Sequence, residues 1–157
     1  RWKANAVTGL SYEIGMSDPK TDEALPGITD VDTPTVGNGV TDIVAVHMDT
    51  DQTLTTTELI GDGTTGAAAL SSGPTLTTAA YTPTAGTYQT MLISARANLG
   101  YAAIWNGSGF VGVFSVANGP DSGVLIRPFA LFRTRNTVSK TIDIDYIGIG
   151  WERNDNT

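Results

Sequence analysis

The chain has 157 residues, a formal net charge of −7 and no cysteine. This length fits one domain that can bury a core of its own, and the lack of cysteine excludes disulfide bonds, thiol catalysis and cysteine-bound zinc. Nucleic-acid and anionic-lipid partners are disfavoured, because they need clustered basic residues, whereas the lysines are scattered at Lys3, Lys20 and Lys140.

Charged residues make up only 16% of the chain, and Thr, Ser, Asn and Gly supply most of the polarity. Because strands favour Thr and turns favour Gly and Asn, this composition indicates β structure. No apolar run approaches the roughly 18–20 residues of a membrane span, and no signal peptide is visible. Since the first residue is Arg1, we expect a processed or partial product.

The N-terminal part of the chain alternates between apolar and polar residues in two short segments, 2–7 and 11–16. This alternation is typical of half-buried strands. A long loop at residues 17–41 follows, marked by Asp-Pro, Leu-Pro-Gly, Thr-Pro and Gly-Asn-Gly. Loops of this length often carry a contact surface, and the alternative is a solvated excursion without a partner.

Strand signals resume at residues 42–48 and continue in a Thr-rich segment at 53–60. Residues 64–85 are rich in Ala, Thr, Gly and Ser and contain two prolines. We therefore expect irregular structure there with one short strand.

The second half of the chain has clearer strand patterns, and its turns are marked by Gly and Asn. Asn106-Gly107 lies between two alternating apolar runs and predicts a hairpin, because both residues accept a positive φ. Pro128 near the start of the strand predicted at 125–135 indicates a sheet edge or a bulge. The strands predicted in this half are 88–97, 101–105, 110–116, 125–135 and 141–151.

These patterns amount to eight to ten strands and no helix. They predict an all-β fold, a two-sheet antiparallel β-sandwich or jelly roll, as a single domain over residues 1–157.

His47 is the sole histidine, so any His-dependent catalytic triad would have to use it. Asp49 would project beside it from one strand face, but no Gly-x-Ser-x-Gly elbow marks a nucleophile. We expect His47 to be a structural residue and predict no catalytic residue in the chain.

Three Asp-x-Asp pairs raise the question of a calcium site, because loop carboxylates suit Ca²⁺. EF-hand spacing is absent, and we expect no required cofactor or metal, although a loop could hold Ca²⁺. The third pair lies within a strand and is expected to face solvent or to pair with Arg133 or Arg135. The pairs are Asp30/Asp32, Asp49/Asp51 and Asp143/Asp145.

A glycosidase needs two carboxylates on either side of a cleft, and Asp143 and Asp145 could lie at such a spacing. Sandwich glycosidases of similar topology carry Glu-x-Asp-x-x-Glu on a central strand, and both glutamates are absent here. A hydrolase is therefore the weakest functional hypothesis.

Three aromatic residues, Tyr101, Trp105 and Phe110, surround the predicted hairpin tip. Exposed rings at this place could stack on sugars, but we favour the alternative that they are core residues of two paired strands. Asn106-Gly107-Ser108 is a formal glycosylation sequon, although the turn explains it fully.

The segment 88–153 resembles the C-terminal half of concanavalin A-like (laminin-G-like) jelly rolls found in bacteriophage virion proteins. The resemblance lies in the hairpin and in "LIRPFALFRTRNTVSKTIDIDYIGIGWER", whose last strand follows the pattern T-h-D-h-D-Y-h-x-h-x-W-x-R, where h is apolar. It implies that this last strand closes a sheet beside the N-terminal strand. The loop at 17–41 has no counterpart in the family pattern.

The resemblance implies a non-enzymatic virion structural protein, a capsid decoration (cement) protein or a head or tail fibre module. It also implies coat protein or other virion proteins as partners, a trimeric homo-oligomer, and a place on the virion surface. The alternative is a secreted, lectin-like module that binds host-surface glycans through Tyr101, Trp105 or Tyr88.

Overall fold

The structure is a computed structural model that describes residues 1–28, 36–50, 57–63, 75–79, 81–96, 99–117 and 119–150, with the backbone alone for 75–79. These residues form ten strands and no helix. Consistent with that, no helix in the described part of the chain is long and apolar enough to cross a membrane.

The ten strands form two antiparallel sheets of five strands each. The first sheet has the order β10-β1-β6-β7-β8, and the second has the order β5-β4-β3-β2-β9. The strands are β1 (Trp2–Ala4), β2 (Leu10–Ser17), β3 (Ile43–Asp49), β4 (Thr57–Asp62), β5 (Thr75–Ala79), β6 (Gln89–Arg96), β7 (Leu99–Asn106), β8 (Gly109–Ala117), β9 (Arg127–Thr134) and β10 (Ile142–Ile144).

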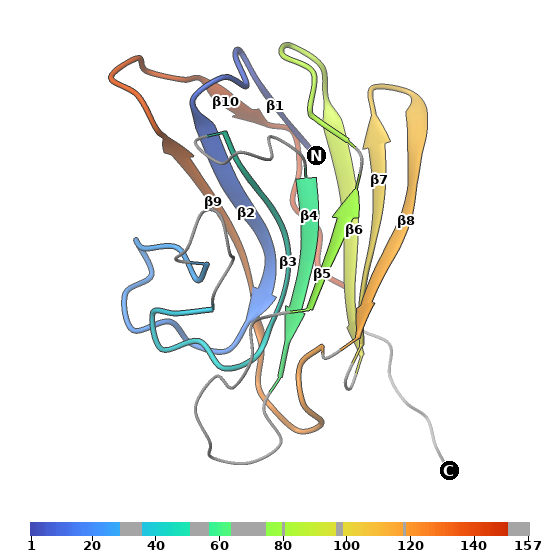
Figure 1. Cartoon of the computed structure of the whole chain (residues 1–157). Helices are drawn as coiled ribbons and strands as arrows, with labels where there is room; N and C mark the ends of the chain where they lie inside the picture. The colour runs from blue at the N-terminus through green and yellow to red at the C-terminus, as the bar shows by residue number, and fades with distance from the viewer. Residues whose placement is uncertain are drawn as a thin grey trace.

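Figure 1 shows the sheets as two facing layers, with β2, β3 and β9 on one side and β6, β7 and β8 on the other. The predicted two-sheet antiparallel β-sandwich is therefore confirmed. Two further expectations are also confirmed, the first implied by the resemblance and the second by the position of Pro128. The last strand pairs with the N-terminal strand, as Trp2 opposite Ile144, and Pro128 lies in β9, which is an edge strand.

Apolar side chains of both sheets fill the space between the layers, because alternate residues of each strand point inward. Trp2 is central to this core, and its ring lies 4.9 Å from Tyr12 and 5.1 Å from Phe132 between centroids. The fully buried members come from strands far apart in sequence. They include Leu10, Val44, Val46, Met48, Leu59, Ala102 and Ile104.

Two predicted elements differ from the structure. The final strand, expected over 141–151, pairs only over Ile142–Ile144, because β1 beside it is equally short. The hairpin turn lies at Gly107 and Ser108, one residue later than expected, since Asn106 still pairs with Gly109. Of these two turn residues Gly107 has the positive φ, +61°.

Candidate functional site

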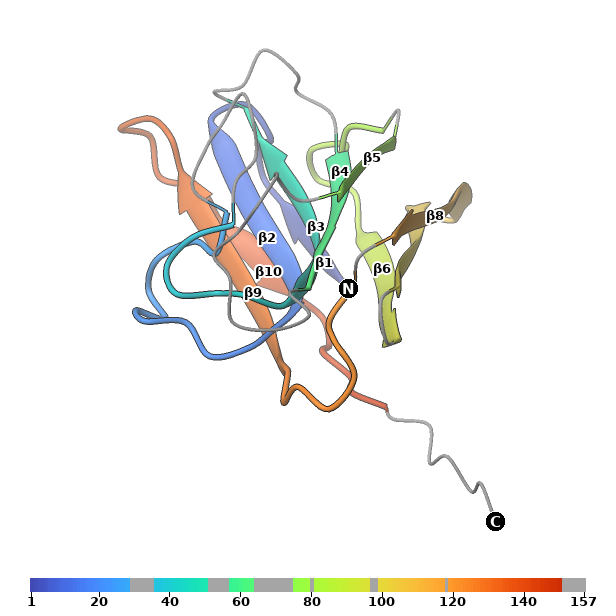
Figure 2. The same ribbon diagram turned by 60° about the horizontal axis from the view of Figure 1, so that its bottom comes forward.

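The outer face of the second sheet is covered by the chain's own long loop. The covering loop, residues 18–28 and 36–42, lies beside β2 and β9 in Figures 1 and 2. Its apolar residues Ile28, Val36 and Val40 are at most 4% exposed and pack on side chains of the sheet. This packing contradicts a solvated excursion for the described part of the loop. The sheet residues beneath are Ile43, Ala45, Ile60 and Phe129.

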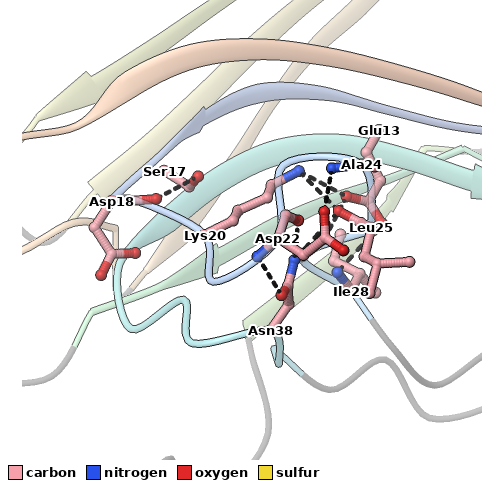
Figure 3. Close-up of polar contacts among 10 residues, drawn as sticks. Glu13, Ser17, Asp18, Lys20, Asp22, Ala24, Leu25, Ile28 and Asn38 are labelled. Atoms are coloured by element: carbon pink, nitrogen blue, oxygen red, sulfur yellow. Dashed lines mark hydrogen bonds and ion pairs between the residues drawn. The ribbon is translucent and has the colours of Figure 1, made fainter.

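A buried carboxylate holds this loop to the sheet. Glu13, in the middle of β2, is 1% exposed, and its two oxygens accept hydrogen bonds from the backbone N–H groups of Gly27 (2.9 Å) and Ile28 (3.2 Å). The same carboxylate also forms an ion pair with Lys20, whose ammonium nitrogen lies 4.0 Å from Glu13 Oε2 (Figure 3). Lys20 also lies over the Phe129 ring, 3.9 Å from its centroid.

The loop also bonds to itself, which makes the cover a built structure. Asn38 accepts a hydrogen bond from the Asp22 N–H at 3.0 Å and donates one to the Asp22 carbonyl at 2.7 Å (Figure 3). At its base, Asp18 accepts bonds from the N–H and hydroxyl of Thr41. Hydrogen bonds of Asn38 and Asp18 therefore join the two arms of the loop, 18–28 and 36–42, to each other.

Burial also shifts the pKa values of Glu13 and Lys20. Desolvation raises the pKa of Glu13, although the hydrogen bond from Gly27 and the charge of Lys20 oppose the rise. Desolvation likewise lowers the pKa of Lys20, and the charge of Glu13 opposes that change. Both directions follow from the cost of keeping a charge away from water. The arrangement suits a structural clamp, because both groups are enclosed and face each other.

His47 continues the polar row that begins at Glu13. The register places Glu13, His47 and Glu58 opposite one another on β2, β3 and β4, and all three are buried. Burial lowers the pKa of His47 to about 4 and raises that of Glu58. Asp49, also buried, accepts a hydrogen bond from the Arg135 Nε at 2.8 Å. At 2% exposure the imidazole has little access to a substrate.

Metal ligation finds little support in the part of the chain that the structure describes. There, no group of three His, Asp or Glu side chains is placed to hold an ion. Asp30, Asp32 and Asp51, which the sequence singled out for Ca²⁺, lie outside the described residues.

The third aspartate pair has different partners from those predicted. Both side chains are exposed, which agrees with the predicted alternative that they face solvent. The other alternative, pairing with Arg133 or Arg135, is wrong, because Asp143 lies 3.3 Å from Lys3 and Asp145 lies 3.1 Å from Arg1. The physical reason is topological, because β10 lies beside β1 in the first sheet, whereas both arginines lie at the edge of the second.

The outer face of the first sheet is different in character. We call the outward side chains of β6, β7 and β8 the open face. Leu92, Phe110 and Val113 are 64%, 59% and 65% exposed there. The face contains no carboxylate and a single charged residue, Arg96. Its members are Thr90, Leu92, Ser94, Arg96, Leu99, Tyr101, Ala103, Trp105, Phe110, Val113, Ser115 and Ala117.

All three aromatic residues of the predicted glycan site lie on the open face. The expectation that they are core residues is wrong, because their neighbours Ala102 and Ile104 take the inward positions of β7. A bulge beside Trp105 brings Phe110 opposite it, and the two ring centroids are 5.4 Å apart. Tyr101 lies four residues before Trp105 and therefore on the same side of β7.

Sequence reasoning missed both the clamp and the extent of the open face. Nothing in the local pattern marks Glu13, since a Glu within an alternating strand normally points to water. The open face had a readable signal: β8 reads Gly-Phe-Val-Gly-Val-Phe-Ser-Val-Ala, an uncharged strand at a sheet edge. Natural edge strands usually carry charges or proline.

Comparison of the chain with protein-family models, with curated proteins and with solved structures finds no match. The arrangement of its own residues therefore carries the functional argument.

Proposed function

We propose that the protein is a non-enzymatic structural component of a particle surface, a bacteriophage capsid decoration protein or fibre module that works through protein–protein contacts. The observation that carries this proposal is the open face, a broad apolar surface without carboxylates on a chain of net charge −7. Exposed apolar patches of this kind mark interaction surfaces. The resemblance of segment 88–153 to virion jelly rolls supports the choice of particle.

The charge distribution supports a protein partner in particular. An acidic protein repels other acidic surfaces at long range. The open face adds no negative charge to this repulsion, because its one charged residue is Arg96. The chain's own loop already covers the corresponding face of the second sheet. A coat protein or another virion protein would therefore dock on β6, β7 and β8.

The test is co-sedimentation of the purified protein with intact particles of the virus that carries this sequence. We expect binding, and expect Leu92→Lys with Val113→Lys to weaken it at least tenfold, because two charges would be buried at the contact. Leu125→Lys is the matched control, since Leu125 is 77% exposed outside the open face. Absence of binding by the unaltered protein would contradict the proposal.

A second candidate, glycan binding, has one observation in its favour. Trp105, Phe110 and Tyr101 present aromatic rings on the open face, and the first two form a close pair. Sugars stack on such rings. A glycan array measures this binding directly. Specific binding that is lost in Trp105→Ala and kept in Leu125→Ala would establish a lectin-like role. Absence of binding by the unaltered protein would eliminate it.

A further inference from the structure

The two sheets end in edge strands of different character. β9, at one edge of the second sheet, carries Arg127 and Arg133 and contains Pro128. β8, at one edge of the first sheet, has nine residues and reads Gly-Phe-Val-Gly-Val-Phe-Ser-Val-Ala, without a charge or a proline. Charges and prolines are the usual protection of an edge strand against pairing with another chain. β9 therefore has this protection, and β8 lacks it.

Among the described residues, β8 has β7 as its one strand neighbour. The connection that follows β8 leads away from its outer edge. A Cβ added at Gly119 would meet the backbone of Leu99, and one added at Gly63 would meet the Gly119 carbonyl, so the connection passes the first residue of β7 toward the end of β4. In Figure 1 it then continues to β9. β6 and β7 also separate β8 from β1, so this edge is an internal feature of the chain.

The outer edge of β8 is regular over most of its length. The bulge beside Trp105 leaves Val111 without a partner on β7, whereas residues 112–117 pair with β7 without interruption. Because a bulge bends the strand that carries it, a further strand is expected to pair with the regular part. Side chains in that part alternate between the core and the open face. Those on the open face are Val113, Ser115 and Ala117, and all three are exposed.

We propose that this edge pairs with the same edge of a second copy of the chain, so that the first sheets of the two copies join into one. A twofold axis perpendicular to the sheet makes the two β8 strands antiparallel, as a regular ladder requires. Opposite residues of an antiparallel pair point to the same side, so the open faces of the two copies also lie on one side. The contact uses the same edge of both molecules and therefore closes at two copies.

The charge of the chain favours this contact between copies. Each copy has a formal net charge of −7, so two copies repel each other wherever their carboxylates meet. β8 contains no charged residue, and β5, which lies near β8 on the same side of the sandwich (Figure 2), reads Thr-Leu-Thr-Thr-Ala. Pairing along β8 therefore brings two acidic molecules together without placing carboxylates against each other along the paired strands.

The pairing enlarges the surface that the chain offers to a partner. Strand addition gains its affinity from main-chain hydrogen bonds, and the side chains of alternate residues add specificity. In the joined sheet the open faces of both copies lie side by side as one surface. The inference thus deepens the proposed contact function and rests on it for the role of the dimer, whereas the strand pairing itself does not depend on a particle.

The first test is the molar mass of the purified 157-residue chain by light scattering and sedimentation over a range of concentrations. We expect a dimer. Val113→Lys with Ser115→Lys should raise its dissociation constant at least tenfold, because like charges of the two copies then lie close together across the axis. Leu92→Lys with Ser94→Lys is the matched control, since these exposed residues occupy the same two rows of the open face on β6. It should leave the dimer unchanged.

A mixture of two variants tests whether β8 pairs with itself. Val113→Glu with Ser115→Glu should also dissociate the dimer, because it too places like charges across the axis. Mixed in equal amounts, the lysine and glutamate variants should form a dimer with one copy of each, since opposite charges then face each other. If the two variants stay apart in the mixture, the copies do not meet along β8.

The chain has no cysteine, which allows a test of the axis itself. In an antiparallel pair related by a twofold axis, one residue of β8 must lie opposite the same residue of the other copy. Single cysteines introduced along the strand should therefore form an intermolecular disulfide readily at one position and less readily at its neighbours. Cross-linking that is equal at all positions would contradict the pairing. The variants are Val113→Cys, Phe114→Cys, Ser115→Cys and Val116→Cys.

The outcomes are distinct from those for the proposed function. A chain that stays monomeric, forms the trimer that the resemblance implies, or forms a dimer insensitive to Val113→Lys with Ser115→Lys overturns the pairing, even if it binds particles. A dimer that responds as stated but never binds particles supports the pairing and contradicts the particle function.

Discussion

The outer faces of the two sheets differ in what covers them. The second sheet has the buried polar residues Glu13, His47, Asp49 and Glu58 on its outer face, where its own loop packs on Ile43, Ala45 and Ile60. The first sheet leaves Leu92, Phe110 and Val113 in water. Polar side chains are thus inside on one side of the molecule and apolar ones are outside on the other. The difference teaches that the loop completes the fold, whereas the open face is available to a partner.

The largest expected effect is at the clamp. Glu13→Ala should lower the free energy of unfolding by about 3–5 kcal/mol, because it leaves the Lys20 charge and two backbone N–H groups buried without their acceptor. Urea denaturation of Glu13→Ala and of the unaltered chain measures this difference in the free energy of unfolding. Glu23→Ala is the control, since its exposed pair with Arg127 contributes about 0–1 kcal/mol. Equal effects of the two variants would mean that Glu13 does not hold the loop.

The next effect compares one apolar residue from each outer face. Ile28→Ala, in the covering loop where this side chain packs on the second sheet, should cost about 2–5 kcal/mol of stability, as for a buried aliphatic side chain. Leu92→Ala on the open face should change it by less than about 0.5 kcal/mol. Thermal or urea unfolding of both variants provides the measurement. A cost at Leu92 as large as at Ile28 would show that the isolated chain already covers its open face.

The smallest effect is the pH dependence that His47 adds. Burial lowers the pKa of His47 to about 4 in the folded chain, against about 6.5 when unfolded. Between these values the unfolded chain binds the proton and the folded chain does not, so stability falls as pH drops from about 6.5 to about 4, by up to about 3 kcal/mol. Glu13 and Glu58, whose pKa values burial raises, act in the opposite direction.

This contribution can be isolated because His47 is the sole histidine. Its imidazole signal in an NMR titration reports the folded pKa without interference from another histidine. A midpoint near 6.5 would mean that the ring is solvated and that the outer face of the second sheet is open. The difference in the pH profile of stability between the unaltered chain and His47→Gln then measures the coupling to folding.

Local pattern predicted most strands, because alternation along a strand is a property of neighbouring residues. The hairpin between β7 and β8 and the edge position of Pro128 followed from such signals, whereas the pairing of the two terminal strands was implied by the resemblance. The length of the last strand did not, since pairing depends on the strand beside it, and β1 has only the three residues Trp2–Ala4.

The candidate sites were predicted less well. Tyr101, Trp105 and Phe110 were predicted as a group, but the expectation that they point into the core was wrong. Alternation along a strand shows that its two sides differ, and it does not show which side the other sheet covers. On β7 both sides are apolar, and the small Ala102 and Ala103 leave the choice to packing. The clamp was missed because Glu13 and its partners Gly27 and Ile28 are separated by an irregular loop.

By itself the sequence determined the all-β class, the approximate strands and the low fraction of charged residues, because each depends on residue type and short-range spacing. Only the tertiary structure decided which sheet covers its outer face and which leaves it open. That choice depends on where the 18–42 loop folds back, through one buried carboxylate and a few apolar contacts. Such contacts join residues distant in the chain, and no local pattern encodes them.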